Sequence, residues 1–76
     1  MNIHEKFGLA VAILRKKKGY SQERFALEAS IARKYMSDIE NGKRNVSLDV
    51  INRIAETLDI RVCDLFLKVE ELGSNN

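Results

Sequence analysis

The 76-residue sequence has no proline, a single cysteine and no long apolar run, and each of these features excludes a class of protein. With Cys63 as its one cysteine, the chain cannot form an internal disulfide, which excludes a secreted scaffold held by bridges. No apolar stretch approaches the roughly 20 residues that cross a bilayer. The opening MNIHEKFG carries a glutamate where a signal peptide would have its basic and apolar regions. We therefore expect a cytoplasmic protein that does not enter membranes.

Catalytic and metal-binding motifs are also scarce. His4 is the one histidine and Cys63 the one cysteine, so a typical zinc site is not expected. No arrangement of serine, histidine and acid and no glycine-rich phosphate loop is visible, which argues against an enzyme. Nothing indicates a cofactor or a small-molecule ligand. We expect Cys63 to be a small, buried or half-buried apolar side chain rather than a redox sensor.

The composition predicts one compact, mostly helical domain. Apolar residues make up 45% of the chain and charged residues 32%, a mixture that favours a folded rather than a disordered chain. At 76 residues the domain is close to the size below which a hydrophobic core alone rarely suffices. Pairing with a second copy would bury additional apolar surface.

Charge is distributed unevenly between the two parts of the chain. Residues 1–44 hold ten Lys or Arg against five Asp or Glu, a balance of +5, whereas residues 45–76 hold three against six, a balance of −3. Lys16 to Lys18 are explained by the end of a helix, whose dipole favours cations there. That explanation does not extend to Arg33, Lys34, Lys43 and Arg44. The first part of the chain is therefore suited to a polyanion.

Apolar spacing and capping residues predict five helices and no strand. The first helix carries Ile3, Phe7, Ala10, Val11 and Leu14 and stops before Gly19. Ser21 is a good N-cap for a helix over 22–28, with Tyr20 and Phe25 placed as a hydrophobic staple. Ser47 caps a fourth helix. Further helices are expected over 33–41 and 62–72, and the fourth helix has an apolar stripe of Leu48, Ile51, Ile54, Ala55 and Leu58.

The helix over 33–41 has two different faces. Ala32, Met36 and Ile39 cluster on one side, with Tyr35 at its edge, and should bury against the second and fourth helices. The other side presents Lys34, Ser37, Asp38 and Asn41, with Arg33 at the exposed start of the helix. These side chains suit base edges and phosphates in a DNA major groove, which admits one helix. A solvated surface helix would also be polar on its outer face, but a short helix, a short turn and a second short helix favour DNA.

The run RKKKGYSQERFALEASIARKYMSDIENGKRNVSL, continued by IAETLDIRVCDLF, resembles the Cro and phage-repressor (XRE-like) helix-turn-helix family over roughly residues 7–66. The pattern R-x-Y-x-S-x-I-E-x-G-x-R-N-x-S-L most resembles the controller proteins of restriction-modification systems. The resemblance implies an all-α, compact, five-helix lambda-repressor-like DNA-binding domain. We expect that domain, with a C-terminal dimerisation helix, to occupy residues 1–72, followed by a disordered tail over 73–76.

The resemblance also implies roles for individual residues. Base contacts are implied for Arg33, Lys34, Ser37 and Asp38, and phosphate or groove-edge contacts for Gln22, Tyr35, Asn41, Lys43 and Arg44. Arg33 can bond guanine through two donors, and Asp38 could accept from cytosine but would repel phosphates. Tyr35 could instead be a half-buried ring that seals the junction of the second and third helices. Arg15 and Glu40 match a buried salt bridge that joins the first helix to the third.

Four positions depart from the family pattern. Ser30 and Asp59 stand where glycine is usual, Ala32 where serine or threonine caps the third helix, and Val46 where proline is common. Ser30 would have to adopt a left-handed backbone, and the missing cap at Ala32 should cost about 1 kcal/mol. The turn is therefore less well specified than the helices.

The last helix has more apolar residues than one core-facing stripe needs. We expect Leu65 and Phe66 to face the core and Leu67, Val69 and Leu72 to remain for a second copy of the chain, although these residues could also cover their own core. Two modules about 34 Å apart would read half-sites of a palindromic operator one helical turn apart. The sequence thus predicts a homodimeric regulator bound to double-stranded DNA. The alternative is an antitoxin-type protein-interaction module, which the short chain beyond residue 72 disfavours.

Overall fold

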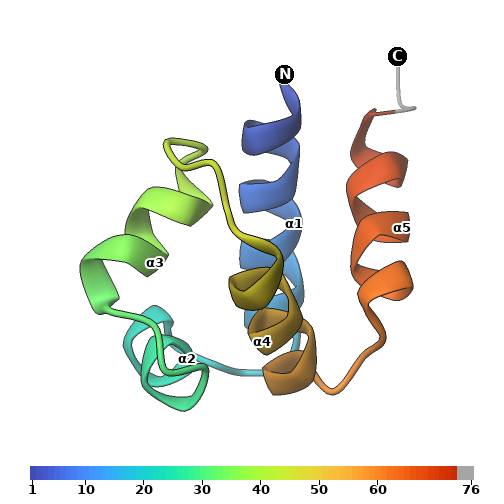
Figure 1. The fold of residues 1–76 in the computed structure, drawn as a ribbon. Helices are drawn as coiled ribbons and strands as arrows, with labels where there is room; N and C mark the ends of the chain where they lie inside the picture. The colour runs from blue at the N-terminus through green and yellow to red at the C-terminus, as the bar shows by residue number, and fades with distance from the viewer. Residues whose placement is uncertain (74–76) are drawn as a thin grey trace.

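The computed structural model describes residues 1–73, which form five α-helices and no strand, as predicted (Figure 1). The helices are α1 (Ile3–Lys17), α2 (Gln22–Glu28), α3 (Arg33–Glu40), α4 (Leu48–Leu58) and α5 (Val62–Gly73). Compared with the prediction, α3 ends one residue earlier, with Asn41 as its C-cap, and α5 includes Gly73. Residues 74–76, the rest of the predicted tail, lie outside the described residues.

Helix α1 lies at the centre of the molecule and contacts α3, α4 and α5 (Figure 1). Helix α5 runs antiparallel to α1 on one side, and α2 and α3 lie on the other side. Helix α3 packs chiefly against α1 and α2, whereas the sequence predicted that it would pack against α2 and α4. The polar residues of α3 therefore lie at the edge of the molecule that is farthest from α5.

Side-chain caps explain where three of the helices begin. The Ser21 hydroxyl accepts a hydrogen bond from the Arg24 backbone N–H at 3.1 Å, and Ser47 accepts from the Val50 N–H at 3.2 Å. Asn2 forms a capping box at the start of α1, which the sequence analysis missed. The predicted staple is present, because the rings of Tyr20 and Phe25 lie edge to face with centroids 5.4 Å apart.

Two non-glycine residues adopt the left-handed backbone that the family pattern assigns to glycine. Ser30 has φ of 58° and Asp59 has φ of 59°. The Ser30 carbonyl accepts a hydrogen bond from Arg53 Nη1 at 2.7 Å, so α4 helps to hold the turn between α2 and α3. Ala32 caps α3 without a side-chain hydrogen bond, as expected. Contacts from α4 therefore support a turn whose own sequence specifies it poorly.

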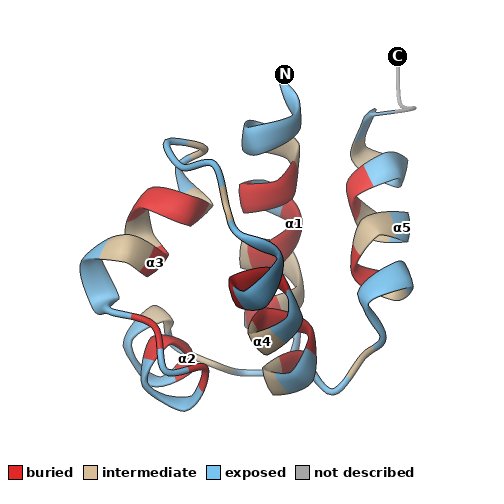
Figure 2. Cartoon of the chain, viewed as in Figure 1, coloured by how far each residue is buried: buried red, intermediate tan, exposed pale blue. Residues whose placement is uncertain are grey.

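The core is formed by apolar side chains from all five helices (Figure 2). Within α1, Gly8 allows a close approach of the end of α3, because a Cβ atom there would collide with the backbone oxygens of Ile39 and Glu40. A glycine inside a helix costs about 1 kcal/mol relative to alanine, and this contact accounts for it. The end of α3 therefore packs directly against α1. The buried apolar side chains include Phe7, Val11, Phe25, Met36, Ile39, Ile54, Leu58, Leu65 and Val69.

Three side chains that were predicted to be buried or half-buried are exposed. Leu48 is 84% exposed because the buried stripe of α4 is centred on Val50, Ile51 and Ile54 rather than on the first turn. Ala32 is exposed; it precedes α3 with a non-helical backbone, so the helical pattern does not apply to it. Cys63 is exposed because it lies roughly opposite Leu65, which faces the core.

Candidate nucleic-acid interface

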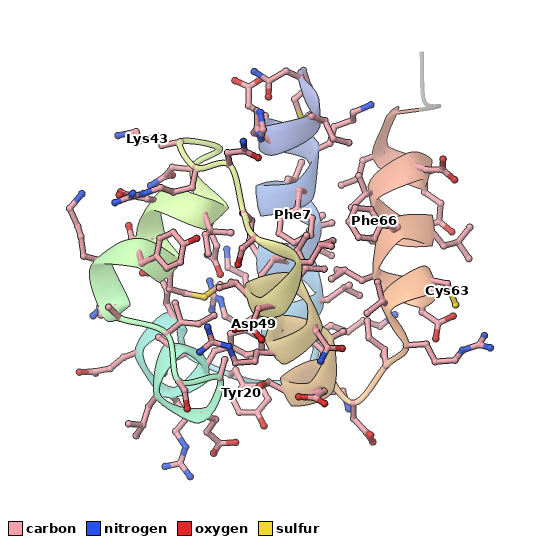
Figure 3. The ribbon with its side chains drawn as sticks, viewed as in Figure 1. Phe7, Tyr20, Lys43, Asp49, Cys63 and Phe66 are labelled. Carbon is pink, nitrogen blue, oxygen red and sulfur yellow. The ribbon has the colours of Figure 1, made fainter. Side chains whose placement is uncertain are left out.

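The outer face of α3 is polar and is supported by a buried apolar face. Met36 and Ile39 lie in the core, whereas Arg33 and Lys34 are exposed and Ser37 is half-buried (Figure 2). The loop that follows α3 continues this surface: Asn41, Lys43 and Arg44 are all exposed, and Lys43 projects away from the molecule in Figure 3. One side of the protein thus presents cations and hydrogen-bonding groups on a short, well-anchored helix.

The inner end of α3 is held by an ion pair with α1. Arg15 Nε lies 2.7 Å from Glu40 Oε2, and Arg15 Nη2 donates to Glu40 Oε1 at 3.0 Å. Arg15 Nη1 donates to the backbone oxygen of Tyr20 at 2.8 Å. Both charged side chains are 8% exposed, so the pair is well shielded from water. This is the salt bridge that the resemblance implied, and it connects α1, the start of α2 and the end of α3.

Gln22 extends this network to the start of α3. Its amide nitrogen donates to Glu40 Oε1 at 3.0 Å, and its amide oxygen accepts from Arg33 Nε at 3.1 Å. The family resemblance implied a contact between Gln22 and DNA. These internal bonds were not predicted, because α2 and α3 meet at an angle that no spacing rule supplies. The bond to Arg33 Nε leaves the two terminal nitrogens of that guanidinium available for a ligand.

Asp38 does not lie on the open surface, and the prediction of an outward-facing carboxylate was wrong. The residue is only 8% exposed. Lys34 Nζ donates to Asp38 Oδ1 at 3.0 Å, and Arg44 Nε and Nη2 both lie 3.2 Å from Oδ2. The Lys34 ammonium, aided by Arg44, holds the pKa of Asp38 below its usual value. Both oxygens of the carboxylate are thus engaged within the protein.

Tyr35 is half-buried, and its ring contacts the cationic side chain of Arg44. The guanidinium carbon of Arg44 lies 5.1 Å from the centroid of the Tyr35 ring, a distance typical of a cation–π contact. The side chain also packs against the core. Tyr35 therefore covers part of the core and orients Arg44. A contact between Tyr35 and DNA stays a prediction.

Comparison with known proteins agrees with this arrangement. Residues 11–65 match the helix-turn-helix family model. The chain belongs to the helix-turn-helix family. The match extends from the middle of α1 to the start of α5 and so includes α2, α3 and the turn between them.

The most similar proteins include small control proteins. Control protein C.MunI from Mycoplasma sp is 44% identical over 92% of this chain and 96% of its own length. Control protein C.BamHI from Bacillus amyloliquefaciens is 46% identical over 84% of this chain and 80% of its own length. The crystal structure of the restriction-modification controller protein C.AhdI from Aeromonas hydrophila is 44% identical, with a TM-score of 0.79 over 82% of this chain and 94% of that protein.

Helix α5 lies away from the helix-turn-helix and divides its apolar residues differently from the prediction. Leu65 is buried, and the Phe66 ring lies 5.7 Å from that of Phe7 across the α1–α5 contact (Figure 3). Val69 is also buried, so the prediction that it remains for a partner was wrong; four residues after Leu65, it faces the same core. Leu67 is 58% exposed and Leu72 is half-buried against the core.

The described residues contain neither a cluster of potential metal ligands nor a helix that could span a membrane. Across residues 1–73, no group of three histidine, cysteine, aspartate or glutamate side chains is placed to hold a metal ion. In the same part of the chain, no helix is long and apolar enough to cross a membrane.

Proposed function

We propose that this protein is a sequence-specific regulator of transcription that binds double-stranded DNA with α3 in the major groove. The observation that carries the proposal is the outer face of α3, which is polar, cationic and rigidly supported by the Arg15–Glu40 ion pair and by Gly8. A helix with exposed donors and a fixed inner face is the arrangement by which helix-turn-helix proteins read base edges. Similarity to control proteins supports this assignment.

Within this proposal three residues on the outer face of α3 make the base contacts. Arg33, at the start of α3, directs its terminal nitrogens to N7 and O6 of guanine, since its Nε is bonded to Gln22. Lys34 and Ser37 reach neighbouring bases. The contacts with phosphates or groove edges are made by residues around this helix: Gln22, Tyr35, Asn41, Lys43 and Arg44.

We propose that the protein acts in the cytoplasm as a homodimer on a palindromic operator. One module with a few phosphate contacts would bind weakly at physiological salt, and a second linked module increases the affinity without new kinds of contact. The exposed Leu67 on α5, with Leu72 beside the core, is the predicted contact between copies. A Leu67→Lys variant should sediment as a monomer at micromolar concentration and bind the operator at least about tenfold more weakly. A wild-type protein that sediments as a monomer would refute the dimer.

The narrower proposal is that the protein controls a restriction-modification system. It rests on the similarity to C.AhdI, whose solved structure is described as that of a restriction-modification controller protein. Genes for a methyltransferase and an endonuclease beside the gene for this protein would support the assignment. A chromosomal neighbourhood without them would count against the narrower proposal and leave DNA binding intact.

Selection from a pool of random duplexes tests the main proposal. The wild-type protein should enrich one palindromic sequence with half-sites about one helical turn apart. Arg33→Ala should lose the preference for a guanine in each half-site, at a cost of about 1–3 kcal/mol per lost base contact. An exposed arginine on α2, Arg24, provides the matched control, because Arg24→Ala should enrich the wild-type sequence. Failure of the wild-type protein to enrich any sequence would refute the proposal.

A further inference from the structure

Asp38 and the two cations that bind it form a cluster on the proposed DNA-binding face. Lys34 and Arg44 approach the carboxylate from different sides, one from the same helix and the other from the loop that follows α3. The side chain of Asp38 is 11% exposed, whereas those of Lys34 and Arg44 are 82% and 49% exposed. The anion is therefore covered by the cations, and the cations face solvent.

This geometry changes the charge that DNA encounters. Two cations and one anion leave a net charge of +1 at the cluster, and the carboxylate competes with any phosphate for the same donors. The stacking of Arg44 on Tyr35 limits how far that guanidinium can swing toward a phosphate. Non-specific binding depends almost entirely on phosphate contacts, whereas specific binding also gains from base edges. A carboxylate that restrains Arg44, a proposed phosphate contact, and offsets the charge of Lys34 therefore weakens non-specific binding more than specific binding.

We infer that Asp38 is a specificity-determining residue that acts as an internal counterion, restraining Lys34 and Arg44 and lowering the affinity for DNA of random sequence. The inference rests on the proposed function, since it concerns the same DNA-binding face. It replaces the direct base contact that the sequence suggested for Asp38. Accepting a hydrogen bond from cytosine would require the carboxylate to give up bonds that it already makes to Lys34 or Arg44.

The test is the ratio of the affinity for the enriched operator to the affinity for a scrambled duplex of the same length and composition. In Asp38→Asn, binding to the scrambled duplex should strengthen about threefold to tenfold at about 0.1 M salt, with a steeper salt dependence equivalent to about one additional phosphate. Binding to the operator should change less, so the ratio should fall. Glu56→Gln, at an exposed position on α4 outside the cluster, removes the same single charge and should leave the ratio unchanged.

A second comparison tests the inference without altering Asp38. Arg44 and Lys43 are both proposed phosphate contacts on the loop after α3, but Arg44 is already paired with Asp38 whereas Lys43 lies outside the cluster. Arg44→Gln should therefore weaken binding to the scrambled duplex less than Lys43→Gln does. Thermal denaturation without DNA establishes that each variant is folded at the assay temperature, so a loss of fold in Asp38→Asn would leave this second comparison as the deciding one.

Three results would overturn the inference, and a fourth would overturn the proposed function. An unchanged ratio in a folded Asp38→Asn variant, or an equal cost for Arg44→Gln and Lys43→Gln, would overturn the inference. A new base preference at one operator position in Asp38→Asn would also overturn it, in favour of a direct base contact. If the wild-type protein shows no preference for any duplex, the proposed function itself fails, which is a different result from an unchanged ratio.

Discussion

Glu40 and Asp38 lie two residues apart on α3, and each carboxylate holds two other side chains, yet their surroundings differ. Glu40 faces inward and bonds Arg15 of α1 and Gln22 of α2. Asp38 bonds Lys34 and Arg44, whose cationic side chains are exposed to solvent. Residues two apart on a helix point about 200° from one another, so one acid can bond partners in the interior and the other can bond cations that face solvent.

The comparison shows that the surroundings of an acidic residue, more than its type, determine its effect. Around Glu40 the donors are shielded from water, so removing the carboxylate leaves an arginine buried without its partner, which is costly. Around Asp38 the cations can turn to water when the carboxylate is lost. We therefore expect variants of Glu40 to affect folding and variants of Asp38 to affect DNA binding.

The largest effect is expected for Glu40→Ala. Breaking a buried ion pair from one side typically costs about 3–5 kcal/mol, which is a large part of the stability of a small domain. Urea denaturation should show a large fall in the midpoint for this variant. The exposed Arg24–Glu28 pair on α2 provides the control, because Glu28→Ala should lower the midpoint far less. Full stability of Glu40→Ala together with altered DNA preference would contradict the assigned roles.

Gly8→Ala tests the same inner contact from the side of α1. The added methyl group would collide with the backbone oxygens of Ile39 and Glu40, and overpacking of this kind costs about 1–3 kcal/mol. Thermal denaturation should show a lower Tm, although alanine is the better helix former. An unchanged or higher Tm would mean that α1 and the end of α3 do not meet at Gly8.

Acidification should distinguish Asp38 from the other carboxylates. Because the pKa of Asp38 is lowered in the folded protein, this group stabilises the fold above its usual pKa of 3.8, and the contribution is lost as pH falls through the folded-state pKa. Urea midpoints measured between about pH 6 and pH 2 should therefore fall more steeply for the wild type than for Asp38→Asn. Glu28 and Asp64 also have lowered pKa values, but both proteins contain them, so their contributions to the difference between the two curves cancel. Parallel curves would contradict the pairing of Asp38.

The smallest effect is expected at the turn that precedes α3. Ser30 adopts a left-handed backbone, which glycine occupies without steric cost, so Ser30→Gly should stabilise the protein by about 0.5–1 kcal/mol. The urea midpoint should rise, and the enriched DNA sequence should stay the same because the turn already has the required geometry. A fall in the midpoint would mean that Ser30 contributes bonds beyond its backbone carbonyl.

The elements of the fold were predictable because their signals are local. Ser21, Ser47 and Gly19 mark helix ends through hydrogen bonds and backbone angles that involve only neighbouring residues. The family resemblance supplied the Arg15–Glu40 pair, which no local signal reveals.

The errors concern which side of a helix faces the core and which partner a charge chooses. Leu48 and Val69 were misplaced because the buried stripes of α4 and α5 are set by how these helices pack against each other and against α1, a tertiary feature. Asp38 was misplaced because Arg44 reaches it from a loop whose path the sequence does not specify.

An NMR titration with the enriched duplex most directly tests the central claim, that α3 and the loop after it contact the DNA. We predict that the largest chemical-shift changes occur in α3 and the loop after it, at Arg33, Lys34, Ser37 and Lys43, with little change at Cys63 of α5. Shifts confined to α5, with α3 unperturbed, would contradict it.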